Sequence, residues 1–440
     1  MDLKYELPEI NSVSDISKVS DEDAKYTCKL PKYTSGADFR AKGAFVARKT
    51  RADVLWIDGL ADYDANAQQN FIEALTLATY RHPRFGLTEV PHVQPKVVNV
   101  VGLDEDLLES IKARTESTFI ARDLTNFPSS IKNPEWMAEQ VKELSDIPGL
   151  EVKVIHYEEL IERGFGGIVA VGKGSVNKPC LIHLTYTPED ADENTAHYAL
   201  AGKGITFDTG GVNLKSRAGM EIMNTDMGGS AVVFGVIRAV AELKLNVKID
   251  SLMAMAENHI GGGAYRPADI VTSYSGKTME IVNTDAEGRV VLSDAIGYAA
   301  LELKPDFIID LATLTGSSTM TVGHQHSCFY STHDGLAEGL IESGEASGEY
   351  LWRMPFAYDE YRGMLDSRHA DIMQGNYDIG GGSVAAAVIL EYYAEGVPWA
   401  HFDMAGPARF PKDYDEYVKG ATGYGVRCLV EYFERNFANK

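Results

Sequence analysis

The sequence predicts an α/β protein with two domains: a smaller N-terminal α/β domain over residues 1–110 and a larger domain over residues 111–440, in which helices flank a mixed sheet. Three observations support this prediction. A chain of 440 residues is too long for one ordinary hydrophobic core. Hydrophobic residues make up 45% and charged residues 24%, as in water-soluble globular proteins. Beyond residue 130, apolar segments of strand length alternate with helical patterns.

The first 110 residues combine short strands and helices. Residues 96–101 predict a strand, because four of the six are valine. Phe71, Ala74, Leu75 and Ala78 recur at helical spacing and predict one buried helix face. The charged segment 104–125 favours a helix that joins the two domains, so we place the boundary near residue 110.

The later part predicts a buried sheet with helices on both faces. Asn133-Pro134 is a typical helix start, and further helices are expected over 230–243 and 290–301. The expected strands cover 152–156, 167–171, 180–184, 198–201, 249–254, 307–311 and 399–402. Sites in such folds gather at the carboxyl ends of strands. Lys203, Asp208, Thr313 and Asp403 lie at or just past those predicted ends.

The charge balance and the cysteines limit the class of protein. The net charge of −23 repels phosphate backbones, so nucleic-acid binding is a poor first hypothesis. The four cysteines have no C-x-x-C spacing, which indicates isolated thiols in a reducing compartment. We expect a cytoplasmic protein, because the first residues lack a secretion pattern and no apolar run has the length of a membrane helix.

The segment Asn283-Thr284-Asp285-Ala286-Glu287-Gly288-Arg289 carries the strongest chemical signal. In an extended chain, the side chains of Asp285, Glu287 and Arg289 would project to the same side. Placing two carboxylates and a guanidinium together costs free energy unless further charges lie among them. Two metal ions and a bound anion would meet that need, and a helix beginning at Val290 would favour the anion.

A second segment runs from Lys203 to Asp226. Lys203, Asp208 and Lys215 alternate charge along it, and Gly210-Gly211 would let the backbone approach a ligand closely. Taken alone, this segment has a plain alternative, because clusters of opposite charge are usually solvated salt bridges on a surface.

Several motifs together resemble the leucyl aminopeptidase family of two-metal exopeptidases. The family signature N-T-D-A-E-G-R is present unchanged at 283–289. Its G-K-G-I-T-F-D-[ST]-G-G, D-M-G-G and A-T-L-T-G stretches match residues 202–211, 226–229 and 312–316, in the family's order. The resemblance covers roughly residues 120–440 and is faint before residue 110.

The resemblance implies a role for each matching residue, and a catalytic function for the larger domain. The implied metal ligands are Lys203, Asp208, Asp226, Asp285 and Glu287. Lys203 can act as a ligand only as a neutral amine, so nearby dications must lower its pKa. Lys215 would polarise the scissile carbonyl, and Arg289 would hold a bicarbonate that acts as general base. The pocket for the first side chain would include Met223, Thr313, Leu314 and Gly316.

The resemblance also implies cofactors and partners. We expect two divalent ions per chain, with zinc, manganese, magnesium and cobalt all suited to this ligand set. The expected activity is release of N-terminal, leucine-like residues from peptides, and the expected assembly is a homohexamer. The sequence departs from the family at Gly261-Gly262-Gly263, where a Ser or Asn is usual, and at Val290, where Leu is frequent. Neither position matches a ligand.

Three other functions fit the sequence less well. A non-catalytic scaffold of the same fold would not need the complete set of implied ligands with Lys215 and Arg289. A DNA-binding role, known for some family members, conflicts with the acidic balance. Another two-metal hydrolase, such as a phosphatase, would need no lysine directed at a peptide carbonyl. Separately, Gly167-x4-Gly172-Lys173 approaches a phosphate-binding loop, but Gly174 replaces the required Ser or Thr.

Overall fold

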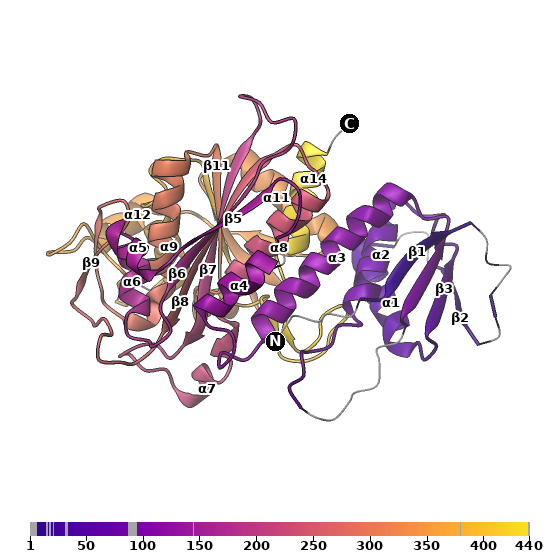
Figure 1. The fold of residues 1–440 in the computed structure, drawn as a ribbon, viewed down its shortest axis with the longest axis horizontal. Helices are drawn as coiled ribbons and strands as arrows, with labels where there is room; N and C mark the ends of the chain where they lie inside the picture. Colours follow the sequence, from indigo (N-terminus) through magenta and orange to yellow (C-terminus); the bar gives the residue numbers. More distant parts are fainter. Residues whose placement is uncertain are drawn as a thin grey trace.

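The computed structural model describes residues 7–438, apart from 15, 17, 18, 21, 31–33, 87–94, 144 and 379. Two α/β parts, each with its own sheet and core, are joined by the long helix α3 (Glu105–Asn126). Figure 1 shows the smaller part at one end of the molecule and α3 running from it toward the larger part. The two-part α/β architecture predicted from the sequence is confirmed.

The smaller part is a parallel sheet covered by helices. Its strand order is β1-β4-β3-β2, with bounds Glu9–Val13, Val97–Val101, Val54–Asp58 and Ala24–Thr27. Helices α1 (Gly36–Lys49) and α2 (Ala65–Leu77) pack on it. The predicted face of α2 is confirmed, since Phe71, Ala74 and Leu75 are fully buried. The predicted boundary at 110 lies inside α3, and its exact position stays a prediction.

The larger part is built on a mixed sheet of eight strands. Their order is β13-β12-β15-β11-β7-β8-β6-β5, with bounds Tyr350–Arg353, His326–Ser331, Trp399–Asp403, Phe307–Ala312, His197–Asp208, Lys248–Asn258, Cys180–Tyr186 and Leu150–Ile155. The central strands β15, β11, β7 and β8 are parallel to one another. Their carboxyl ends therefore open on one edge of the sheet.

Helices cover both faces of this sheet (Figure 1). One face packs against α4 (Pro134–Glu143), α8 (Gly228–Glu242), α11 (Asp334–Ser347) and α14 (Val426–Phe437), together with the second half of α3. The other packs against α5 (Tyr157–Glu162), α6 (Gly166–Gly172), α9 (Glu287–Tyr298) and α13 (Gly382–Glu391). Short elements complete the chain: α7 (Arg217–Met220), α10 (Gly316–Val322), α12 (Tyr358–Arg362), β9 (Ile270–Thr272), β10 (Thr278–Glu280), β14 (Ile372–Met373), β16 (Arg409–Phe410) and β17 (Gly420–Ala421). No helix of the described chain combines the length and apolarity needed to cross a bilayer.

The predicted strand at 167–171 is wrong, because these residues form helix α6. Ile168, Val169 and Val171 favour a strand by local preference, but a short apolar run has no period that separates strand from helix. The tertiary environment decides the conformation here. Gly166 and Gly167 lie so close to neighbouring backbone that an added Cβ would be 2.0 Å from Thr272 O and 2.2 Å from Val290 O.

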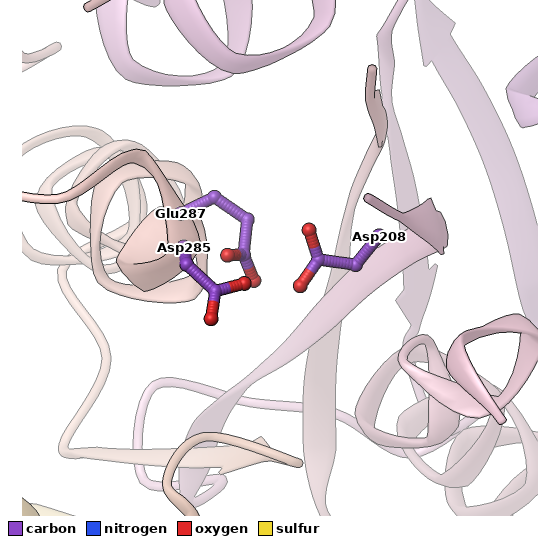
Figure 2. A group of neighbouring side chains, drawn as sticks. All are labelled: Asp208, Asp285 and Glu287. Carbon is purple, nitrogen blue, oxygen red and sulfur yellow. The ribbon is translucent and has the colours of Figure 1, made fainter. Parts of the chain in front are cut away.

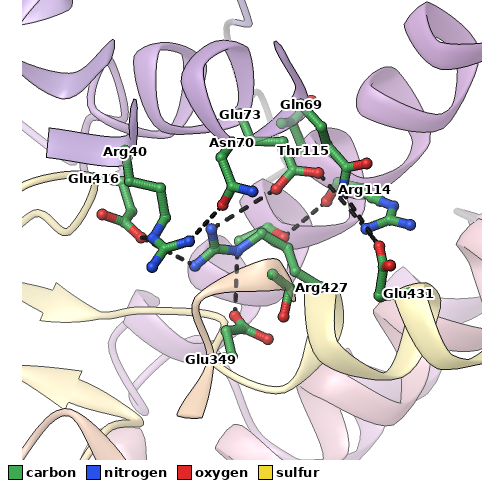
Figure 3. Close-up of polar contacts among 12 residues, drawn as sticks. Arg40, Gln69, Asn70, Glu73, Arg114, Thr115, Glu349, Glu416, Arg427 and Glu431 are labelled. Carbon is green, nitrogen blue, oxygen red and sulfur yellow. Dashed lines mark hydrogen bonds and ion pairs between the residues drawn. The ribbon is translucent and has the colours of Figure 1, made fainter. Parts of the chain in front are cut away.

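A buried network of charges joins the smaller part to the larger one (Figure 3). Arg114 of α3 contacts Glu431 of α14 at 2.6 Å and Glu73 of α2 at 3.9 Å. Arg427 of α14 lies 3.3 Å from Glu349 and 3.8 Å from Glu73. Neither oxygen of Glu73 has a hydrogen-bond partner among the described residues, and the residue is fully buried. Burial therefore raises the pKa of Glu73 to about 7, despite the two arginines.

Candidate metal centre

Four acidic side chains meet at the carboxyl edge of the central strands. Asp208 is the last residue of β7, and Asp226 follows the short 3-10 helix η1 (Met223–Thr225). Asp285 lies within the 3-10 turn η2 (Thr284–Ala286), and Glu287 is the first residue of α9. The prediction that Asp208 and Asp403 lie at the ends of strands is confirmed, whereas Lys203 lies inside β7, which extends seven residues past its predicted end at 201.

Three of these carboxylates form a compact cluster (Figure 2). Asp208, Asp285 and Glu287 each offer one oxygen, and the three oxygens all lie within 4.8 Å of one another. Asp208 and Glu287 are buried, while Asp285 is half-buried. Oxygen atoms of like charge at this separation repel one another unless a cation lies among them.

The route by which Asp285 and Glu287 converge differs from the predicted one. Residues 283–289 are not extended, because the side chain of Asn283 accepts a hydrogen bond from Asp285 N at 2.9 Å and starts a helical turn. Helix α9 then begins at Glu287 rather than at Val290. Arg289 consequently takes a different direction: its Nη1 donates to Gln374 O at 2.8 Å, and it forms no ion pair with a carboxylate of the described chain.

Two lysines, the buried Lys203 and the partly buried Lys215, stand among the carboxylates as counter-charges. Lys203 Nζ lies 2.8 Å from Asp226, 2.8 Å from Glu287 and 3.0 Å from Thr313 O. Lys215 Nζ lies 2.8 Å from Asp208 and 2.5 Å from Asp285. The alternative of a solvated surface cluster is wrong, since Lys203, Asp208 and Glu287 expose 3%, 1% and 1% of their surface.

The lysines do not balance the charge of the centre. Four carboxylates face two ammonium groups, so two negative charges remain without a partner when all groups are ionised. Burial and the neighbouring acids raise the pKa of Asp208, and burial raises that of Asp226 to about 6 against the opposing Lys203. Burial lowers the pKa of Lys203, but Asp226 and Glu287 outweigh burial and hold it above its ordinary value.

Two buried polar atoms without hydrogen-bond partners in the described chain are suited to bind a cation and an anion. Among the described residues, Glu287 Oε2 and Arg289 Nε are buried and have no hydrogen-bond partner. A free carboxylate oxygen in this cluster suits a divalent cation, and a free guanidinium N–H suits an anion. Burial lowers the pKa of Arg289, while Tyr377 and Asp403 oppose that change. The residues present therefore fit two cations, with an anion near Arg289.

Glycines at two places let the backbone pass close to the carboxylate cluster. Gly210 and Gly211 have φ angles of +85° and +63°, which other residues rarely adopt. A Cβ at Gly288 would lie 2.8 Å from Leu314 and 2.9 Å from the Lys203 side chain. The first turn of α9 can therefore pack directly against Lys203 and the loop after β11.

The residues predicted to surround the first substrate side chain lie next to the carboxylates. Thr313 Oγ1 donates to Asp226 Oδ1 at 2.8 Å, and Leu314 packs against Gly288. Gly316 begins α10 and has open space around it, with no atom within 4 Å of an added Cβ. Met223 is half-buried and accepts the Asp226 N–H through its backbone oxygen at 3.4 Å.

Sequence reasoning missed Asn258, which ends β8. Its Nδ2 donates to Asp208 Oδ1 at 2.7 Å and to Thr284 O at 3.0 Å, so it ties two acidic segments together. Its position after the predicted strand 249–254 was the available signal, but β8 extends four residues past that predicted end. Lys132 was also missed: its buried ammonium donates to Thr125 O and Asn224 O, beside the turn that carries Met223.

Comparison with known proteins decides the family. The model of the cytosol aminopeptidase family catalytic domain matches residues 119–430. The chain belongs to the cytosol aminopeptidase family. This family's probable cytosol aminopeptidase from Syntrophotalea carbinolica (strain DSM 2380 / NBRC 103641 / GraBd1) is 40% identical over 379 residues, which cover 84% of this chain and 75% of the relative. The corresponding protein of Aquifex aeolicus (strain VF5) is 36% identical, covering 91% and 82%.

Solved structures agree with this family assignment. The bottromycin maturation enzyme BotP in complex with Mn superimposes with a TM-score of 0.84 and 33% identity, covering 91% of this chain and 88% of that chain. Cytosol aminopeptidase from Coxiella burnetii gives a TM-score of 0.82 and 30% identity, covering 91% and 85%. As a cytosol aminopeptidase, the chain is a metal-dependent exopeptidase that acts on peptides, and its family depends on a dinuclear metal centre.

Proposed function

We propose that this aminopeptidase releases leucine-like N-terminal residues from peptides, with two divalent ions held by Lys203, Asp208, Asp226, Asp285 and Glu287. The observation that carries the proposal is the buried cluster of Asp208, Asp285 and Glu287, whose oxygens lie within 4.8 Å of one another. Its charge exceeds that of Lys203 and Lys215. When bound, two divalent cations lower the pKa of water and stabilise negative charge that develops during peptide hydrolysis.

The two lysines take different roles in this proposal. Lys203 is fully enclosed by Asp226, Glu287 and Thr313 O, so its amine has no access to substrate and is suited to be a ligand. The side chain of Lys215 is 15% exposed, at the border of the cluster. Divalent ions that neutralise Asp208 and Asp285 would release Lys215 to donate a hydrogen bond to the scissile carbonyl.

Arg289 supports a general base that is not a protein side chain. Its guanidinium is buried, contacts Gln374 O and keeps Nε without a partner in the described chain. A planar anion such as bicarbonate matches the fork of a guanidinium through two parallel hydrogen bonds. Bicarbonate held there would accept the proton of the attacking water.

Substrate selection would act at the first residue of the peptide. Met223, Thr313, Leu314 and Gly316 supply mostly apolar atoms beside the cluster, and the open space at Gly316 leaves room for a branched side chain. A free α-amine can serve as a further ligand to one cation, which would limit cleavage to the N-terminus. We further propose a cytoplasmic homohexamer, which light scattering of the purified protein would test.

The deciding experiment compares Leu-Gly-Gly with N-acetyl-Leu-Gly-Gly, each assayed with zinc, manganese, magnesium or cobalt. Cleavage of the first peptide to leucine and Gly-Gly, with the acetylated peptide intact, is expected. Acetylation removes a ligand and misaligns the carbonyl, and misalignment alone costs ~10²-fold. Comparable cleavage of the acetylated peptide in mass spectra, or internal cuts in a longer peptide, would refute recognition of the free N-terminus.

A further inference from the structure

Asp403 is a buried carboxylate that holds the loop following β11. It ends β15 and exposes none of its surface. Its side chain accepts hydrogen bonds from Thr315 N at 3.1 Å, Thr315 Oγ1 at 2.5 Å and Ser383 Oγ at 2.8 Å. Its backbone oxygen accepts a fourth from Ser318 Oγ at 2.8 Å. These donors come from the loop, from α10 and from the start of α13: the carboxylate joins the loop to α13, and the backbone oxygen of the same residue holds α10.

The same loop contacts the candidate metal ligands two residues earlier. Thr313 O accepts from Lys203 Nζ at 3.0 Å, and Thr313 Oγ1 donates to Asp226 Oδ1 at 2.8 Å. Leu314 and the Lys203 side chain both lie against Gly288, in the first turn of α9. Thr313 therefore contacts Lys203 and Asp226 at once, in addition to the direct ion pair between them.

We propose that Asp403 is a positioning residue, which acts through Thr315 and Thr313 to hold Lys203 and Asp226 in the arrangement that binds a divalent cation. The inference rests on the proposed function of these two residues as metal ligands. Asp403 itself touches neither of them, so its effect passes through the loop. Groups that orient metal ligands from outside typically change metal affinity or activity by ~10–100-fold when removed.

The hydrogen bonds of Asp403 favour this role over simple packing, because they use both of its carboxylate oxygens. A buried carboxylate whose partners are neutral hydroxyl and amide groups costs stability compared with an uncharged side chain. Two hydroxyls donate to the single oxygen Oδ2, while Thr315 N donates to Oδ1. An asparagine offers one acceptor oxygen, so it cannot accept from all three donors in these positions.

A matched control lies on the adjacent strand. Asp310 of β11 is equally buried and pairs in register with His401 of β15. Its carboxylate accepts from Trp399 Nε1 at 2.7 Å and contacts His401 Nδ1 at 2.6 Å, and neither partner belongs to the loop. Asp310→Asn therefore removes a buried carboxylate from the same sheet without releasing Thr315.

The test measures metal binding and catalysis separately. Metal-stripped wild type, Asp403→Asn and Asp310→Asn would be titrated with Mn²⁺ by calorimetry, then assayed on leucine p-nitroanilide. We expect Asp403→Asn to weaken Mn²⁺ binding and lower kcat/KM by ~10–100-fold, with Asp310→Asn within about threefold of wild type. Equal Mn²⁺ affinity in all three proteins would overturn the inference, and an inactive wild type that binds Mn²⁺ would refute only the proposed function.

A second pair of variants decides the matter if Asp403→Asn fails to fold. Thr315→Ser keeps the hydroxyl that donates to Asp403, whereas Thr315→Val keeps the shape and loses the donor. Thr315→Ser is expected to keep the Mn²⁺ affinity of the wild type. Thr315→Val is expected to bind Mn²⁺ more weakly, as Asp403→Asn does. Equal affinity in this pair would overturn the positioning role.

Discussion

Lys203 and Glu287 form a buried ion pair that joins the middle of β7 to the first residue of α9, with Nζ 2.8 Å from Oε1. Lys203 thereby offsets part of the negative charge of the carboxylates around it. Since the carboxylates hold the pKa of Lys203 above its ordinary value, its amine carries a proton that a cation must displace.

Metal binding is therefore expected to release protons and to strengthen as the pH rises. Lys203 must lose its proton, and Asp226, whose pKa is about 6, must be ionised. Calorimetric titration with Mn²⁺ at pH 6 and pH 8, in buffers of different ionisation enthalpy, would give the number of protons released. An affinity that is the same at both pH values, with no proton release, would contradict Lys203 as a ligand.

Replacing Lys215 with alanine should lower kcat by ~10²–10³-fold while two metal ions remain bound. The expected cause is loss of a hydrogen bond made as charge develops on the carbonyl. Lys248→Ala is the control, because this lysine lies at the start of β8, near Asp250 and away from the cluster. Metal content by elemental analysis and steady-state kinetics would be measured on all three proteins. A near-normal kcat for Lys215→Ala would rule out the proposed role.

Replacing Arg289 with alanine should reduce kcat less than the Lys215 change, because Arg289 would only place the bicarbonate. Added bicarbonate should stimulate the wild type more than Arg289→Ala. The assay would follow initial rates over a bicarbonate series in carbonate-depleted buffer. The same response in both proteins would count against an anion at the buried guanidinium.

The pH dependence of stability should reveal Glu73. Its pKa of about 7 in the folded chain lies above the ordinary 4.5, so the folded state binds more protons than the unfolded state between these values. Its contribution to stability is fully present below about pH 4.5 and is lost as the pH rises through 7. The glutamine of Glu73→Gln cannot ionise. The free energy of unfolding of this variant, relative to that of the wild type, should therefore rise by roughly 2–3 kcal/mol from pH 5 to pH 8.

Thermal unfolding of wild type and Glu73→Gln at both pH values would measure this change. Asp53→Asn serves as the control, because its side chain is 53% exposed and pairs with Lys96 outside the network. A difference between Glu73→Gln and wild type that is the same at pH 5 and pH 8 would show that Glu73 is ionised throughout.

The sequence alone predicted six of the eight strands of the larger sheet and the acidic residues that meet at its edge. Strands β6, β8, β11 and β15 and helix α8 were all predicted, because each is a mostly apolar segment of the length typical of its element. Asp208, Asp285 and Glu287, predicted from short motifs, do lie together. Motifs succeed here because the residue types, rather than their conformations, specify the chemistry.

Only the tertiary structure decided the conformation of short segments and the partners of each charge. Residues 167–171 are a helix although their side chains favour a strand, because α6 packs its glycines against backbone from β9 and α9. Residues 283–289 form a helical turn, so Arg289 donates to Gln374 O and forms no ion pair with Asp285 or Glu287. Asn258 reaches Asp208, and Asp403 reaches Thr315, only because neighbouring strands end on one edge of the sheet. A local pattern specifies which side chains prefer burial, but contacts between distant segments depend on strand order and register, which no short stretch of sequence contains.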